Sequence, residues 1–93
     1  MITELESVRS LPEQKRASVP DLNIRMHLPV GAQVRLLVLV DGVEHLAPDV
    51  VVTEVTDAGY VGHVIDDCVG GSPERRIPEG MRFEFTADHV IEY

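Results

Sequence analysis

From Leu28 onward, turn-forming residues recur about every 8 to 15 residues and divide the chain into short, valine-rich segments. β-Branched residues favour strands, whereas Gly, Pro and Asp-Gly pairs favour tight turns. Segments this short, separated by turns this close, predict antiparallel β structure. The segments that we predict to be strands are residues 34–40, 49–56, 60–65, 81–85 and 90–93.

Local patterns indicate how these strands are connected. Asp41-Gly42 is a dipeptide typical of hairpins, and it ends the apolar run 34–40. Met81, Phe83 and Phe85 alternate with charged residues and should point inward from their strand. Thr86 should cap one helical turn before the last strand. Closure removes exposed strand edges economically in a small domain, so we expect a mainly β chain folded as a small antiparallel barrel of about five strands.

Residues 1–20 differ from the remainder of the chain. Thr3 with Glu6, and Ser10 with Glu13, have the spacing of capping boxes, which predicts short helical turns. Helices this short are marginal alone, and the stretch that follows is polar and flanked by prolines. We therefore expect two parts: a short N-terminal helical arm, residues 1–20, and a single β-barrel domain, residues 21–93.

Length and cysteine content set the class of protein. A chain of 93 residues forms one modest core, and its single cysteine allows no internal disulfide. The first residues show no basic stretch followed by an apolar run, and no apolar segment approaches the roughly 18 residues that span a bilayer. We expect a soluble, cytoplasmic protein.

The negative charge is concentrated in the C-terminal half. Residues 1–40 contain four acids and five bases, a net charge of +1, whereas residues 41–93 contain twelve acids and three arginines, a net charge of −9. Because phosphate contacts supply much of the affinity of nucleic-acid binders, this charge argues against nucleic acid or an anionic membrane as a direct partner. It suits a basic protein surface.

The order of motifs resembles a set of small bacterial domains. The chain reads Val-Gly-x-x-Val-Arg-Leu over 30–36, VVVTEVT, GYVGHVIDD, PEGMRFEF and finally DHVIEY. This order over residues 28–93 resembles bacterial domains of unknown function with an SH3-like barrel, some of which are classed as toxin-immunity proteins. The resemblance implies an SH3-like barrel and no particular activity. The positions that carry it are Gly31, Gly59, Gly62, Gly80, Phe83, His89, Val90 and Ile91.

The stretch GYVGHVIDDC, residues 59–68, is the densest group of chemically reactive side chains. His63, Asp66 and Cys68 could serve a small metal- or thiol-dependent enzyme. However, a zinc site needs three or four converging donors, and adjacent carboxylates on an extended chain diverge. We therefore predict no catalytic residue, no metal and no cofactor, and interpret the stretch as a strand followed by a loop.

These observations favour a non-enzymatic binding domain. We expect an acidic stoichiometric inhibitor, of the toxin-immunity or phage anti-defence (anti-CRISPR) type, that masks a basic surface of its target. An alternative is a structural module in which the run 34–40 pairs two copies into a homodimer. The residues that we predict to bind the partner are Asp41, Glu44, Asp66, Asp67, Glu74, Glu79, Arg75 and Arg76.

Overall fold

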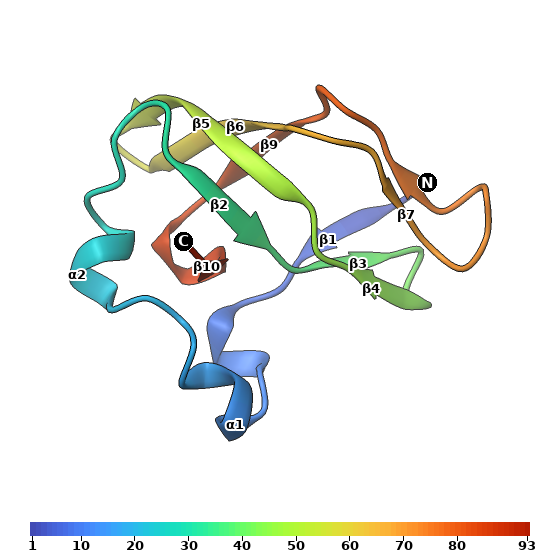
Figure 1. The fold of residues 1–93 in the computed structure, drawn as a ribbon, viewed down its shortest axis with the longest axis horizontal. Helices are drawn as coiled ribbons and strands as arrows, with labels where there is room; N and C mark the ends of the chain where they lie inside the picture. The colour runs from blue at the N-terminus through green and yellow to red at the C-terminus, as the bar shows by residue number, and fades with distance from the viewer.

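A computed structural model describes all residues, 1–93. It is mainly β, and its largest element is a curled, five-stranded antiparallel sheet that forms a half-barrel (Figure 1). The strands of this sheet, in spatial order, are β10 (Val90–Glu92), β2 (Gln33–Leu36), β5 (Asp49–Thr56), β6 (Gly59–Val64) and β9 (Arg82–Phe85). A second sheet consists of β1 (Thr3–Leu5), β3 (Val38–Val40) and β4 (Glu44–Leu46), and a third of β7 (Cys68–Val69) and β8 (Arg76–Ile77). The helical segments are η1 (Val8–Ser10), α1 (Glu13–Arg16), α2 (Leu22–Arg25) and η2 (Ala87–His89).

The predicted strands agree with the structure, with one correction. Residues 49–56 form β5 with the predicted bounds, and the predicted strands near 60–65, 81–85 and 90–93 appear as β6, β9 and β10. The run 34–40 is not one strand, because it divides at Leu37 into β2 and β3, which belong to different sheets. The carbonyl of Leu37 accepts a hydrogen bond from the Glu6 amide, so the N-terminal segment occupies this junction.

The core lies inside the curled sheet. Alternate residues of β2 and β3 are almost completely buried, and Phe83 and Phe85 point inward as predicted, with Met81 packed against them. The rings of Tyr60 and Phe85 lie 5.5 Å apart. The strand order also bears on the alternative of a homodimer paired through residues 34–40: β2 pairs with β5 and β10, and β3 pairs with β1 and β4. Most of the run 34–40 is therefore already paired within the chain, although β10 pairs only with Arg35 and Leu36 of β2.

The Asp41-Gly42 turn joins β3 to β4 as predicted. Asp41 and Gly42 have φ values of +53° and +67°, and the Val43 amide donates to the Val40 carbonyl at 3.0 Å. Positive φ at both central residues is the signature of a type I′ turn, the geometry that joins twisted antiparallel strands.

The first predicted helical turn is wrong. Residues 3–5 form the strand β1, which pairs with β3, and the main chains of Ile2 and Asp41 are hydrogen-bonded to each other. The capping-box spacing of Thr3 and Glu6 favours a local helix, but pairing with β3 satisfies more main-chain groups. The second predicted turn is present as α1, preceded by Pro12 rather than capped by Ser10.

None of the helical segments, each three or four residues long, has the length and apolar character needed to cross a membrane.

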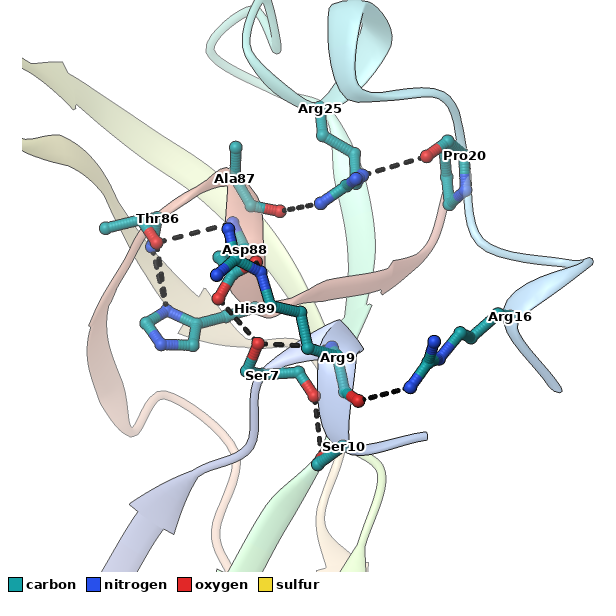
Figure 2. A network of polar contacts seen from close by, with 10 residues as sticks. All are labelled: Ser7, Arg9, Ser10, Arg16, Pro20, Arg25, Thr86, Ala87, Asp88 and His89. Carbon is teal, nitrogen blue, oxygen red and sulfur yellow. Dashed lines mark hydrogen bonds and ion pairs between the residues drawn. The ribbon is translucent and has the colours of Figure 1, made fainter. Parts of the chain in front are cut away.

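Residues 1–25 pack onto the end of the sheet through a polar network at η2 (Figure 2). The Ser7 hydroxyl donates to Asp88 Oδ2 at 2.5 Å, and Arg9 Nε lies 3.6 Å from Asp88 Oδ1. Arg25 donates to the carbonyls of Pro20 and Ala87 at 2.8 and 2.7 Å. The predicted arm is therefore held against the domain by specific hydrogen bonds.

His89 belongs to this network, and its environment predicts that the stability of the protein depends on pH. Its Nδ1 accepts a hydrogen bond from the Thr86 amide at 3.0 Å, so the folded protein needs this nitrogen unprotonated. Burial lowers the pKa of His89 below its ordinary value of 6.5, although the neighbouring Asp88 carboxylate raises it in part. An unfolded histidine takes up its proton near pH 6.5 and the folded one only at lower pH. The free energy of unfolding should therefore fall as the pH drops below 6.5.

An NMR titration of the His89 ring, together with urea unfolding at about pH 7.5 and pH 5, tests this prediction. The ring should titrate below pH 6.5, and His89→Gln, which has no titrating group there, should reduce the acid loss of stability. A His89 midpoint at or above 6.5 contradicts the prediction.

Candidate functional site

Glu44 and Arg75, two of the predicted partner-binding residues, bind each other. Glu44 begins β4, and Arg75 lies in the loop between β7 and β8. The Arg75 Nε donates to Glu44 Oε1, and the Gly71 amide donates to both oxygens of the same carboxylate at 2.9 and 3.1 Å. The Arg75 guanidinium and the Gly71 N–H lower the pKa of Glu44. Glu44 therefore fastens the β7–β8 loop to the β3–β4 hairpin, a structural role.

Other predicted residues also have partners within the chain. Arg76 Nε lies 3.3 Å from Asp67 Oδ2, and Asp67 Oδ1 accepts the Glu79 amide at 2.7 Å. Asp41 accepts the Ile2 amide, and Glu74 accepts the Ser72 hydroxyl. Arg75 and Arg76 therefore pair with Glu44 and Asp67, and not with the nearer carboxylates in the sequence, because the folded loops bring Glu44 and Asp67 close to them.

Asp66 and Glu79 are the predicted residues whose carboxylates have no partner. They lie close in space, because the loop after β6 and the turn before β9 run side by side: the Gly80 amide donates to the Val64 carbonyl at 2.8 Å. Asp66, Asp67 and Glu79 thus gather at one end of β6, which we call the Asp66–Glu79 corner. Two of its three carboxylates face solvent without a counter-ion.

Every arginine of the chain is engaged within the fold. Arg9, Arg35, Arg75, Arg76 and Arg82 contact carboxylates, and Arg16 and Arg25 donate to main-chain carbonyls. Lys15 is the only basic side chain without a hydrogen-bond or ion-pair partner. The carboxylates without any partner are Glu4, Glu13, Asp21, Glu54, Asp57, Asp66 and Glu79. The charged side chains that have no partner within the chain are therefore almost all negative.

The structure does not bring His63, Asp66 and Cys68 into one reactive site. His63 Nδ1 lies 3.0 Å from the Thr53 hydroxyl, on the face that β6 shares with β5. Cys68 pairs with Ile77 in the small β7–β8 sheet and packs against the core. No cluster of three or more His, Cys, Asp or Glu side chains has the spacing of a metal site.

A groove beside the β5–β6 hairpin was not found by sequence reasoning. It has a volume of about 260 Å³ and lies between the end of α2, the hairpin and the start of η2. Met26 and Val55 are apolar lining residues of the groove, although each is more than half exposed. Tyr60 also lines it, and its hydroxyl donates to the Arg25 carbonyl at 2.8 Å. Met26 and Val55 come from segments 29 residues apart, so no local motif predicts their meeting.

Two acidic residues of the same hairpin have no hydrogen-bond or ion-pair partner. Glu54 lies in the exposed half of β5 and Asp57 in the turn that follows. The sequence contains one indication of these two residues. Residues 53–57 are mostly polar, which is unusual for a strand in the middle of a sheet.

Comparisons with protein-family models, with curated proteins and with solved structures found no match to this chain.

Proposed function

We propose that this chain is a cytoplasmic, non-enzymatic binding domain that inhibits its target stoichiometrically by masking a basic protein surface. The observation that supports this most directly is that every arginine, although mostly at the surface, contacts a carboxylate or main-chain carbonyl of the same chain, which leaves free charges that are almost all carboxylates. Such a surface repels nucleic acid and attracts lysine and arginine on a protein.

The Asp66–Glu79 corner is the part of the predicted surface that suits this role. Its free carboxylates need not break an internal ion pair in order to bind a partner, whereas Glu44 and Arg75 would have to release the β7–β8 loop. We therefore assign partner contact to Asp66 and Glu79, with Asp67 and Arg76 beside them, and assign Glu44 and Arg75 to support of the surface.

The proposal extends to the class of inhibitor. The curled sheet is compatible with the SH3-like barrel that the motif order suggests, and a small acidic protein suits both toxin immunity and inhibition of a host defence complex. The two roles differ in target: a toxin bound by its immunity protein is encoded beside it, whereas a phage inhibitor binds a bacterial nuclease complex such as a CRISPR effector.

Affinity capture from the source cells, at low and at raised salt, tests the function. The captured protein should carry a basic surface, and its affinity should fall steeply between about 50 and 300 mM salt, because exposed charges are screened over a shorter distance as salt rises. The double variant Asp66→Lys/Glu79→Lys should weaken binding by about tenfold or more. Recovery of no partner at low salt overturns the proposal.

A matched control distinguishes the effect of the Asp66–Glu79 corner on binding from the effect of net charge. Glu4 and Glu13 are also partnerless, but lie in β1 and α1 of the N-terminal segment. Glu4→Lys/Glu13→Lys changes the net charge by the same amount as the corner variant. It should weaken binding by much less if the corner makes the contact.

A further inference from the structure

The second half of β5 extends beyond the strand that pairs with it. β2 pairs with Asp49–Val51, and the Gly31–Ala32 segment exchanges hydrogen bonds with Val52 at 2.8 Å. Residues 53–56 continue as a strand after a register shift between Val52 and Glu54, with β6 on one side and no strand on the other. All four of these residues are exposed. We call residues 53–56 the β5 overhang.

An open strand edge carries main-chain N–H and C=O groups that another chain can pair with. The other inner strands of this fold, β2, β6 and β3, each lie between two neighbouring strands, although β10 pairs with only Arg35 and Leu36 of β2. The overhang therefore provides hydrogen-bonding capacity that the rest of β5 has already used.

The groove beside the overhang supplies a place for side chains. Val55 is 53% exposed and Met26 is 56% exposed, and together they border the groove of about 260 Å³. A strand added to an edge places alternate side chains on one face, so every second residue of an added chain could pack towards these apolar groups.

Charge selects the occupant. Glu54 and Asp57 lie on either side of Val55 and neither has a counter-ion within the chain. A second copy of this protein would bring acids against acids along the edge, which destabilises cross-strand pairing. An extended segment that carries lysine or arginine would place opposite charges there.

We propose that the β5 overhang binds an extended, basic segment of a partner protein by adding it as a strand to the edge of residues 53–56. This inference rests on the proposed function and specifies how the partner is held. The Asp66–Glu79 corner lies at the opposite end of β6, about 20 Å away for a six-residue strand. The two sites are therefore physically distinct and separately mutable.

The test uses the full chain and a capped peptide of about eight residues that alternates lysine and valine. On binding, the main-chain amides of residues 53–56 should show NMR shift changes, and those that point away from β6 should show slower hydrogen exchange. The same peptide with N-methylated valines, which lacks half of the donors, should bind about tenfold more weakly. A peptide that alternates glutamate and valine should not bind.

Variants locate the contact. Val55→Pro removes a main-chain donor, and its fold is checked by its amide spectrum. Glu54→Lys/Asp57→Lys reverses the charge while leaving the main chain intact, so it remains informative if the proline variant does not fold. The charge variant should weaken lysine–valine peptide binding by about tenfold or more, and Asp66→Lys/Glu79→Lys should leave it unchanged.

Peptide shifts confined to the Asp66–Glu79 corner, an absence of binding, or a peptide-free dimer joined through residues 53–56 would each overturn the strand addition. These outcomes leave the proposed function standing if a basic partner is still captured from cells. Conversely, peptide binding at the overhang with no basic partner captured contradicts the proposed function alone.

Discussion

Replacing Gly62 with alanine should lower the free energy of unfolding by about 3 kcal/mol. Gly62 lies in β6, opposite Val52 of β5 and Phe83 of β9. A Cβ at this position would overlap Val50 Cγ1 and would lie 2.9 Å from the Val51 carbonyl oxygen and 3.0 Å from Phe85 Cε1. Two of these atoms belong to fully packed side chains and one to the main chain, so none can move without disturbing the sheet.

Urea unfolding measures this change, and Gly71→Ala is its matched control. The nearest atom to a Cβ at Gly71 is Glu44 Oε2 at 3.6 Å, an ordinary van der Waals distance. The control should therefore change stability by no more than about 0.5 kcal/mol. If Gly62→Ala unfolds at the same urea concentration as the control, the close approach of the strands around β6 is incorrect.

Deleting residues 1–11 should also remove about 4 kcal/mol or more of stability. Val8 and Leu11 are buried, and such side chains contribute about 2 kcal/mol each. The deletion also removes β1, which leaves the outer edge of β3 unpaired. We expect the shortened chain to be unfolded or to associate through this edge, as shown by circular dichroism and light scattering.

A pair of leucine variants tests the same point without a deletion. Leu11→Ala should cost about 2 kcal/mol, whereas Leu22→Ala, at a leucine that is 55% exposed, should cost less than about 0.5 kcal/mol. A shortened chain that folds as stably as the full one would show instead that residues 1–11 are a separable part of the arm, residues 1–20, that the sequence predicts.

The strands could be predicted because their signals are local. The alternation in residues 81–85 and the Asp41-Gly42 pair report burial and turn geometry within a few residues, and both predictions are confirmed. The strand β1 could not be predicted in this way. The sequence of residues 3–6 has the spacing of a helix cap, and only the presence of β3 makes an extended conformation more favourable.

The candidate site shows the same division. The acidic character of residues 41–93 is a property of composition and can be predicted from the sequence. Which of these carboxylates have no partner within the chain could not be predicted. Glu44 appeared to be a surface contact and is instead bound to Arg75, 31 positions away. Glu54 was not selected at all, although the structure leaves it without a partner beside an open strand edge.

The sequence by itself determined the strand segments of the five-stranded sheet, the tight turns and the excess of negative charge, because periodicity, turn chemistry and composition act between near neighbours. Only the tertiary structure decided that the first residues form a strand, which carboxylates are neutralised by arginines, and where β5 lacks a neighbour. Those properties depend on which distant segments meet, and main-chain pairing leaves little trace in side-chain pattern because every residue carries the same N–H and C=O groups.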